Sequence, residues 1–249
     1  MMKHSFFSDF PAMILAAGRG ERMRPLTDHL PKPMLEIFGK PLLQYHLEGL
    51  KRNHFENIVI NHAWLGNKIE EAFGDGNTLG LHIQYSKEES ALETAGGIVT
   101  ALHLLQPSDY FFVINGDTFI PDFPFEKIPD IVEQLRIDNA EGAKALLAYL
   151  FLVKNPPHHP QGDFYLMSPH VLSDEQLSTN PLGQAKYTFS GAGIYHKSLF
   201  ENLTAGQKAP LAPLLKNAMG SLLVEGELLK CSWHDVGTPD RLLALNQSS

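Results

Sequence analysis

The chain has 249 residues, of which 43% are hydrophobic and 19% charged, and its formal net charge at pH 7 is −8. The length and the apolar fraction are ordinary for one large globular α/β domain with a sizeable core. The acidic balance argues against a nucleic-acid-binding surface, which needs a basic patch, so we expect no nucleic acid among the partners.

Three features indicate the compartment. One cysteine, Cys231, allows no intramolecular disulfide, as in a reducing environment. Residues 1–11 carry a single basic side chain and a very short apolar patch, unlike a secretory signal. No run approaches the roughly 20 apolar residues that a membrane span needs. We therefore expect a cytoplasmic protein with no membrane partner, and we expect Cys231 to be a small buried side chain in a strand, without a catalytic role.

The N-terminal half alternates short apolar runs with stretches of helical spacing. Strands are expected at Met13–Ala17, Ile58–Ile60, His82–Ser86 and Tyr110–Asn115, and helices at about Pro41–Asn53, Leu65–Phe73 and Ala95–Leu105. This alternation predicts a Rossmann-like α/β fold, a single domain with a mixed, mainly parallel sheet flanked by helices. Ligands bind beyond the carboxyl ends of the strands in such sheets, so polar residues that follow these strands are site candidates.

The C-terminal half has shorter and less regular elements. Strands are expected at Ala143–Val153, Phe164–Met167, Tyr187–His196 and Leu228–Trp233, with helices at Leu211–Ala218 and from Pro239 onward. Between the first two strands, the Pro- and His-rich stretch Lys154–Pro160 predicts a lid-like excursion over the sheet. No internal repeat, low-complexity tract or linker interrupts the chain, so we expect one domain over residues 1–249.

The first strand ends in a stretch suited to phosphate groups. Gly18 and Gly20 allow a sharp turn and a close approach of a ligand to the backbone, whose amides then form an anion-binding concavity. The cations that follow are Arg19, Arg22, Arg24 and Lys32. Guanidinium and ammonium groups around such a turn predict a site for several phosphates. The loop matches neither common nucleotide-binding fingerprint, so the residues alone also allow an ordinary turn with nearby arginines.

Two aspartates follow predicted strands. Asp117 ends the run Val113–Asp117, and Asp235 lies within Trp233–Thr238. A carboxylate at the end of a strand near a phosphate loop is suited to Mg²⁺, which usually takes one or two protein carboxylates together with substrate phosphates. Each aspartate alone is equally consistent with turn chemistry before the next element.

Together these stretches resemble a known family. The pattern A-A-G-x-G-x-R-M-x-P at residues 16–25, followed by P-K-P, resembles the opening motif of the sugar-1-phosphate nucleotidylyltransferases. N-G-D at 115–117 and W-x-D-x-G-T at 233–238 are similar to the elements that supply the family's metal-binding aspartates. The resemblance implies a fold of the nucleotide-diphospho-sugar transferase type, with Mg²⁺ as a cofactor held by Asp117 and Asp235.

The resemblance also implies how the other motif residues act. Arg22 and Lys32 would contact the triphosphate and the transferring phosphate as catalytic cations. The expected nucleotide-binding residues are Ala16, Ala17, Gly18, Gly20, Glu21, Arg22, Lys32, Asn61, Glu93, Thr94, Gly96 and Gly97. The expected sugar-phosphate-binding residues are Asn115, Asn155, Ser190 and Gly191.

The implied reaction is an in-line attack of a sugar 1-phosphate oxygen on the α-phosphorus of a nucleoside triphosphate, with pyrophosphate as the leaving group. Positioning and charge neutralisation supply the catalysis. The attacking phosphate is already anionic, so no general base is required, and none of the twelve histidines is assigned that role. Mg²⁺, Arg22 and Lys32 would stabilise the charge that develops in the transition state.

Further stretches resemble one subgroup, the N-acetylmuramate 1-phosphate uridylyltransferases. They are L-E-T-A-G-G at 92–97, N-H-A-W at 61–64, N-P-P-H-H-P at 155–160 with G-D-F at 162–164, and F-S-G at 189–191 with L-A-P-L-L at 211–215. This resemblance implies UTP and N-acetylmuramate α-1-phosphate as substrates, in the recycling of peptidoglycan sugars. It places Glu93, where relatives have Gly, next to the nucleobase. The plain alternative for this stretch is a helix entry capped by Thr94.

The resemblance covers about residues 12–246, with a nucleotide-binding half at about 12–140 and a sugar-binding half at about 141–246. One element is missing, because many relatives carry E-K-P before the F-S-G strand, and its lysine neutralises the sugar phosphate. Lys186 is the nearest cation before Phe189 but belongs to no motif. The cation that holds the sugar phosphate is therefore left open, as are the roles of His158 and His159.

Two alternatives to this substrate pair remain. One is a related enzyme that joins GTP to mannose 1-phosphate or dTTP to glucose 1-phosphate. The other is a non-catalytic nucleotide-sugar sensor, against which the complete set Arg22, Lys32, Asp117 and Asp235 speaks. Nothing in the sequence pattern demands assembly, since no β-helix or coiled coil is predicted, and we expect a monomer.

Overall fold

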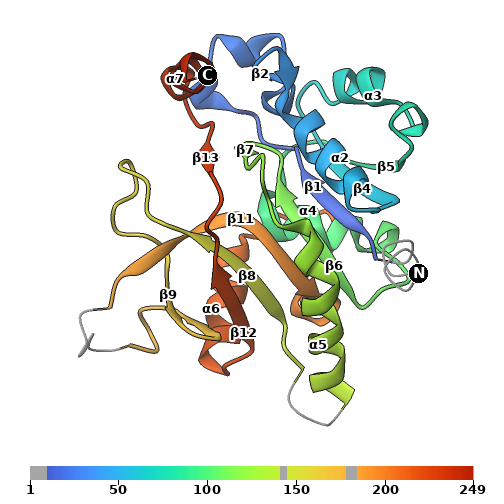
Figure 1. Cartoon of the computed structure of the whole chain (residues 1–249). Helices are drawn as coiled ribbons and strands as arrows, with labels where there is room; N and C mark the ends of the chain where they lie inside the picture. The colour runs from blue at the N-terminus through green and yellow to red at the C-terminus, as the bar shows by residue number, and fades with distance from the viewer. Residues whose placement is uncertain (1–9, 141–144, 178–183, 249) are drawn as a thin grey trace.

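The computed structural model describes residues 10–140, 145–177 and 184–248, except for the side chains of residues 138–140. The fold is built on one nine-stranded sheet (Figure 1). The strands are ordered β5-β4-β1-β6-β11-β8-β12-β10-β9. Their bounds are β1 Ala12–Leu15, β4 Asn57–His62, β5 His82–Lys87, β6 Tyr110–Asn115, β8 Ala148–Val153, β9 Phe164–Met167, β10 His170–Leu172, β11 Lys186–His196 and β12 Val224–Leu228. Two short ribbons pair β2 Glu36–Ile37 with β3 Lys40–Pro41, and β7 Thr118–Phe119 with β13 His234–Asp235.

The sheet is parallel in its N-terminal part and mostly antiparallel beyond it. β4 and β6 flank β1 in parallel, and β5 extends that set. β11 then runs antiparallel to both β6 and β8, while β12 returns parallel to β8. This confirms the expected α/β fold with a mixed sheet. It also places the carboxyl ends of β1, β4 and β6 side by side.

Helices cover both faces of the sheet, because successive side chains of each strand point to opposite faces. The α-helices of the described part are α2 Leu42–Arg52, α3 Asn67–Phe73, α4 Glu93–Ala101, α5 Ile128–Ala140, α6 Leu211–Gly220 and α7 Pro239–Gln247. In β1, Ile14 belongs to the apolar core shared with α2 and α5, whereas Met13 belongs to the core shared with α4 and α6. Figure 1 shows α5 in front of the sheet and α6 behind it.

A third, smaller core ties the C-terminal helix to the N-terminal loop region. Leu242 and Leu245 of α7 pack with Met23, Ile37 and Phe119. The β7–β13 ribbon runs through this cluster, since Phe119 pairs with the residue before Asp235. The C-terminal helix and the loop region after β1 therefore pack together beside the ribbon that contains Asp235.

Several predicted bounds are wrong, and α4 is the instructive case. The helix begins at Glu93 and ends at Ala101, and a 3₁₀ turn at Leu102–Leu104 follows. Thr94 is not its N-cap, which is Leu92 and makes no side-chain capping bond. The carbonyl of Ala209 instead accepts the backbone N–H groups of Ala95 and Gly96, each at 3.0 Å. A distant loop supplies the cap, and local sequence does not show it.

The expected strand at Leu228–Trp233 is also wrong. β12 ends at Leu228, which pairs with Leu152, and the chain then leaves the sheet. Cys231 consequently lies in a bend and is partly exposed, not buried in a strand. Sequence reasoning missed α5 as well, although Ile128, Val132 and Leu135 mark its apolar face.

Some expectations fall wholly or partly outside the described residues. Residues 1–9 of the segment 1–11 are not described, and neither are residues 143 and 144 at the start of the strand predicted from Ala143. Residues 145–147 of that predicted strand are described but not in a strand, and β8 begins at Ala148. β4 extends to His62, so Asn61 lies within a strand and not after it. Within the described ranges, no helix has the length and apolar character that crossing a membrane requires.

Candidate active site

A cavity of about 190 Å³ opens at the carboxyl ends of β1, β4 and β6. This is the edge of the sheet where ligands bind in such folds. The residues that line it are Leu15, Ala16, Ala17, Gly18, Lys32, Pro33, Asn61, Ala91, Glu93, Thr94, Asn115 and Asp117. Nine of the residues predicted to bind nucleotide, sugar phosphate or metal are thus brought together. They are Ala16, Ala17, Gly18, Lys32, Asn61, Glu93, Thr94, Asn115 and Asp117.

The glycine loop leaves β1 in a tightly determined path. The backbone N–H of Ala16 donates to the Asn61 side chain at 2.9 Å, which ties the loop to β4. Gly20 has a φ of +67°, and a Cβ there would lie 3.0 Å from Thr27 Cγ2 and 3.2 Å from Lys32 Cβ. A side chain at Gly20 would therefore be strained and would press on Lys32. The Thr27 hydroxyl donates to the Gly20 carbonyl at 2.8 Å and holds the turn closed.

A buried polar network positions Asn61. Its Nδ2 donates to Glu88 Oε1 at 2.7 Å, and Glu88 Oε2 accepts the backbone N–H of Leu92 at 3.0 Å. Burial raises the pKa of the Glu88 carboxyl, against the lowering effect of these two hydrogen bonds. Glu88 thereby connects β4, the glycine loop and the entry of α4. Sequence reasoning missed Glu88, because no motif marks it and Asn61, its side-chain partner, is 27 residues away in the sequence.

The four cations after β1 have different surroundings. Lys32 is buried and its Nζ lies 2.7 Å from Asp117 Oδ2. Arg19 is stacked 4.0 Å from the Trp64 ring and donates to the Thr27 carbonyl at 2.8 Å. Arg24 pairs with Asp28 at 2.7 Å. Arg22 is exposed, and no ion pair to another described residue holds it.

The two predicted metal-binding aspartates meet through the β7–β13 ribbon. Asp235 is paired with Thr118, the neighbour of Asp117, and the Val236 N–H donates to the Asp117 carbonyl at 3.3 Å. Asp235 Oδ2 lies 2.5 Å from Arg241 Nη1 and 3.4 Å from His158 Nε2. Burial and the Arg241 charge lower the pKa of His158.

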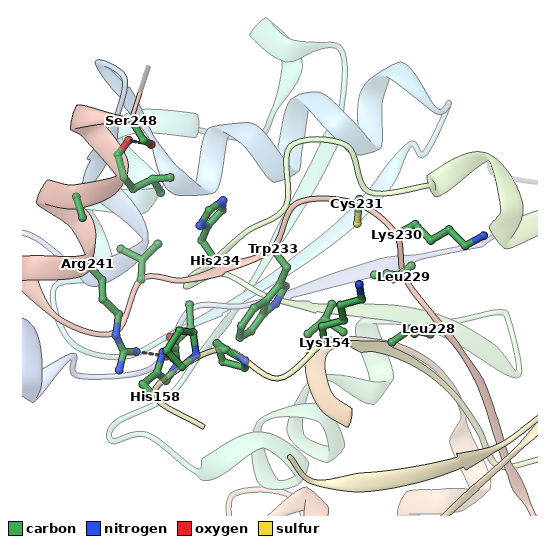
Figure 2. Close-up of a pocket in the computed structure, with 17 residues that line it drawn as sticks. Lys154, His158, Leu228, Leu229, Lys230, Cys231, Trp233, His234, Arg241 and Ser248 are labelled. Atoms are coloured by element: carbon green, nitrogen blue, oxygen red, sulfur yellow. Dashed lines mark hydrogen bonds and ion pairs between the residues drawn. The ribbon is translucent and has the colours of Figure 1, made fainter. Parts of the chain in front are cut away.

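Asp235 also lines a second cavity, of about 830 Å³, bounded by the loop after β8, the segment from β12 to β13, and α7 (Figure 2). Its lining residues are Val153, Lys154, Pro156, Pro157, His158, Leu228, Leu229, Lys230, Cys231, Trp233, His234, Asp235, Val236, Arg241, Ala244, Leu245 and Ser248. The walls are mainly apolar, with cations at both ends. Figure 2 shows Arg241 near His158 at one end and Lys230 at the other.

The predicted sugar-phosphate residues occupy different positions. Gly191, with a φ of +84°, faces Asn115, and a Cβ there would lie 2.6 Å from Asn115 Nδ2. Ser190 is buried, and its carbonyl accepts Trp233 Nε1 at 2.9 Å. Asn155 holds its loop, since its Nδ2 donates to the Pro160 carbonyl at 3.1 Å and to the Lys186 carbonyl at 2.9 Å.

Some predicted residues lie outside both cavity linings. Gly96 packs against the loop that caps α4, where a Cβ would lie 2.4 Å from the Gln207 carbonyl oxygen. Gly97 makes room for Asn61. Glu21 is exposed near Arg19 and Arg24. The lysine considered for the missing E-K-P element, Lys186, pairs with Asp174 at 2.6 Å and lines neither cavity.

Comparison with known proteins identifies this arrangement. Residues 11–249 match the family model described as Nucleotidyl transferase. The chain belongs to the nucleotidyl transferase family. It is therefore an enzyme of the nucleotidyltransferase class, as the resemblance of its motifs to that family implied.

Individual relatives of this nucleotidyl transferase agree. The chain is 48% identical over 234 residues, 93% of its length and 94% of the relative's, to N-acetylmuramate alpha-1-phosphate uridylyltransferase of Neisseria meningitidis serogroup B. It is 25% identical to mannose-1-phosphate guanylyltransferase of Mycobacterium tuberculosis, over 92% of this chain but 61% of that protein. The inositol-1-phosphate CTP transferase of T. maritima has the same fold, with a TM-score of 0.69 at 17% identity over 98% of both chains.

Sequence reasoning missed one side chain beside Asp235, the aspartate that it predicted to bind metal, and left the role of another open. The missed residue is Arg241, which lies in the first turn of α7, six residues after Asp235; the other is His158, in the Pro- and His-rich loop. The sequence does contain a signal for the first. Thr238 caps α7, accepting the Arg241 N–H at 3.4 Å, and Pro239 begins the helix, so the register of Arg241 relative to Asp235 follows from that start.

Proposed function

We propose that this nucleotidyl transferase transfers the uridylyl group of UTP to N-acetylmuramate α-1-phosphate, giving UDP-N-acetylmuramate and pyrophosphate. The observation that carries the proposal is the 48% identity with a relative of that name over 93% of this chain and 94% of the relative. The N-H-A-W, N-P-P-H-H-P and F-S-G stretches support the same subgroup. The product would return a peptidoglycan sugar to nucleotide-activated form.

Positioning and charge neutralisation supply the catalysis in this proposal. A phosphate oxygen of the sugar substrate attacks the α-phosphorus of UTP, and pyrophosphate leaves in line. The glycine loop binds the triphosphate through its backbone N–H groups, and Lys32 reaches the transferring phosphate from the cavity wall. Arg22 is exposed beside the loop and is available to the pyrophosphate portion. No histidine acts as a base, because the attacking oxygen is already anionic.

A divalent metal fits the two aspartates, and we propose Mg²⁺. Asp117 and Asp235 offer only oxygen ligands, and they lie close together because Asp117 immediately precedes β7 and Asp235 is in β13, its partner in the ribbon. No group of three or more His, Cys, Asp or Glu side chains within the described ranges is suited to hold a metal alone. Substrate phosphates would therefore complete the shell, which is how Mg²⁺ is usually bound. When bound, Mg²⁺ would draw charge from the reacting phosphates.

The nucleobase would lie at the entry of α4. Glu93 and Thr94 line the cavity there, opposite the glycine loop. Uracil presents one N–H donor between two carbonyl acceptors, and backbone groups of residues 93–97 have the polarity to match that edge. Glu93 has a φ of +62°, a strained conformation that is often found where a backbone group is held for a ligand.

The other expectations also remain proposals. We infer a nucleotide-binding half at about residues 12–140, a sugar-binding half at about 141–246, a cytoplasmic location and a monomer. The smaller cavity supports the first inference, since all of its lining residues lie between Leu15 and Asp117. Light scattering of the purified protein tests the last: a monomer has a mass of 27.7 kDa.

Pyrophosphate release tests the substrate pair. The purified protein is mixed with Mg²⁺, one sugar 1-phosphate and one nucleoside triphosphate, over a matrix of N-acetylmuramate, glucose, N-acetylglucosamine and mannose 1-phosphates with UTP, GTP, dTTP and CTP. Release only with UTP and N-acetylmuramate α-1-phosphate supports the proposal. Release with mannose 1-phosphate and GTP instead would replace it. Nucleotide binding without release from any pair would favour a sensor.

A further inference from the structure

The carboxylate of Asp235 is covered by a guanidinium. Arg241 Nη1 lies 2.5 Å from Asp235 Oδ2. Gly237 makes room for this pair, since a Cβ there would lie 2.9 Å from both Arg241 Nη1 and Asp235 Oδ2. Figure 2 shows Arg241 of α7 pointing toward His158 from the opposite loop, and His158 contacts the same carboxylate oxygen at 3.4 Å.

The other aspartate is covered in the same way. Lys32 Nζ lies 2.7 Å from Asp117 Oδ2. Each of the two carboxylates proposed to hold the metal therefore has a cation in the position a metal would take. Arg241 places a positive charge directly on Asp235 Oδ2, and that charge repels a divalent ion that approaches the same carboxylate. Metal binding at Asp235 is therefore stronger when Arg241 turns away.

The cavity beside Asp235 limits where Arg241 can then find a partner. Asp235 is the only acidic side chain among the described residues that line this cavity, which also contains Lys154 and Lys230. A guanidinium released from Asp235 would be a partly buried cation without a counter-charge, which is unfavourable unless an anion arrives. A phosphate group matches a guanidinium bidentately and satisfies that requirement.

We propose that Arg241 is a two-position residue: it covers Asp235 when no metal is bound, and it binds the phosphate of the sugar substrate once the metal takes Asp235. This inference rests on the proposed function only for the identity of that phosphate. It supplies a cation for the sugar phosphate in a chain that lacks the E-K-P lysine. Metal and sugar phosphate would consequently bind cooperatively, since each favours the same displacement of Arg241.

Mn²⁺ binding to the protein without substrates, followed by electron paramagnetic resonance, tests the first half. Arg241→Ala removes the competitor, so its Kd for Mn²⁺ should be roughly two- to fivefold lower than that of the unaltered protein, the range expected for an ion pair of this exposure. Arg241→Lys should be intermediate. Weaker binding by Arg241→Ala would mean that Arg241 orients Asp235 for the metal, and would overturn the proposal. Equal binding, including none by either protein, would overturn it as well.

Steady-state kinetics test the second half. Arg241→Ala should raise KM for the sugar 1-phosphate by roughly tenfold or more, with KM for the nucleotide changed much less, and Arg241→Lys should recover part of the loss. An unchanged KM for the sugar phosphate would overturn this half. Arg52→Ala, which removes an exposed arginine at the end of α2, should leave both readouts unchanged.

The two readouts separate this inference from the proposed function. Mn²⁺ binding does not depend on which substrates are used, and KM can be measured with whichever sugar 1-phosphate proves active. Circular dichroism of each variant at the assay temperature confirms that it is folded. If Arg241→Ala does not fold, Arg241→Gln and Arg241→Lys take its place. Each should lower the Kd for Mn²⁺ and raise KM for the sugar 1-phosphate.

Discussion

Gly97 of α4 leaves the space that the amide of Asn61 occupies. A Cβ at this position would lie 2.6 Å from Asn61 Nδ2 and 2.9 Å from Glu88 Oε1. The glycine therefore permits the hydrogen bond between those two side chains, and through it the attachment of the glycine loop to β4. Gly97 does not line the cavity, and it affects the proposed nucleotide site through the position of Asn61.

Gly97→Ala should damage both stability and nucleotide binding. Overpacking of this kind costs about 1–3 kcal/mol, which corresponds to a Tm lower by roughly 2–12 °C for a chain of this size. We expect KM for UTP to rise together with the fall in Tm, because Asn61 would be displaced. Differential scanning fluorimetry and initial rates measure the two effects. A variant with unchanged Tm and KM would show that Asn61 and Glu88 do not depend on this glycine.

Gly18→Ala is the matched contrast. Nothing lies within 4 Å of a Cβ built at Gly18. The substitution should leave Tm within about 1 °C of that of the unaltered protein, since nothing in the fold is compressed. KM for UTP should nevertheless rise by at least about tenfold, because the new methyl group stands in the path of the triphosphate. Unaltered nucleotide affinity would place the triphosphate elsewhere.

Asp117→Asn tests the metal assignment. The amide has nearly the shape of the carboxylate but carries no charge, so the fold should be retained. Turnover should fall by at least about 100-fold, the scale seen when one preorganised electrostatic group is lost. Asp174→Asn, which removes an exposed acid that pairs with Lys186, serves as the control and should turn over normally. Undiminished activity of Asp117→Asn would refute the metal assignment.

Glu93→Gly tests recognition at the entry of α4. Because Glu93 has a φ of +62°, glycine should relieve strain and leave stability equal or higher by up to about 1 kcal/mol. Selectivity among nucleoside triphosphates or sugar phosphates should change, because the side chain lines the cavity. The ratio of kcat/KM values over the substrate matrix measures this. An unaltered ratio would remove Glu93 from substrate recognition.

Asn155→Ala tests whether this side chain acts through its loop. Its amide holds the loop after β8 with hydrogen bonds to Pro160 and Lys186, and its Oδ1 accepts from Thr188. Loss of these bonds should raise KM for the sugar phosphate and should also make residues 154–163 more susceptible to limited proteolysis in the substrate-free protein. A raised KM with an unchanged cleavage pattern would instead indicate direct contact with the sugar phosphate.

His46 should make stability sensitive to acid. Burial lowers its pKa from 6.5 to about 4, against the raising effects of a hydrogen bond to the Thr118 backbone and of the Asp117 charge. The folded protein therefore binds this proton less readily than the unfolded chain. The stability contribution is complete above pH 6.5 and is lost as the pH falls toward 4, by about 3 kcal/mol in all.

His46→Leu should reduce that acid sensitivity. Urea denaturation at pH 7 and pH 5 gives the loss in unfolding free energy for each protein. The loss should be smaller in the variant by about 2 kcal/mol, whatever its absolute stability. His29→Gln, at an exposed position, should keep the sensitivity of the unaltered protein. Equal losses in His46→Leu and the unaltered protein would exclude His46 as the source.

The sequence by itself determined the fold class and most of the cavity lining. Apolar runs and helical spacing are local, so β6 was predicted with its observed bounds, as was β9. Glycines, Lys32 and Asp117 follow strands whose carboxyl ends must meet at one edge of a parallel sheet. Motif residues far apart in the chain could therefore be assigned to one site before their positions were known.

Only the tertiary structure decided what those residues contact. Glu88 became part of the site because β5 pairs with β4, and Ala209 caps α4 because a loop from the second half reaches it. The contact of Asp235 with His158 requires the loop after β8 to reach β13, and the meeting of Asp235 with Asp117 requires the β7–β13 ribbon. These contacts join segments that are distant along the chain, and their energies depend on burial and distance, which no local spacing of residues specifies.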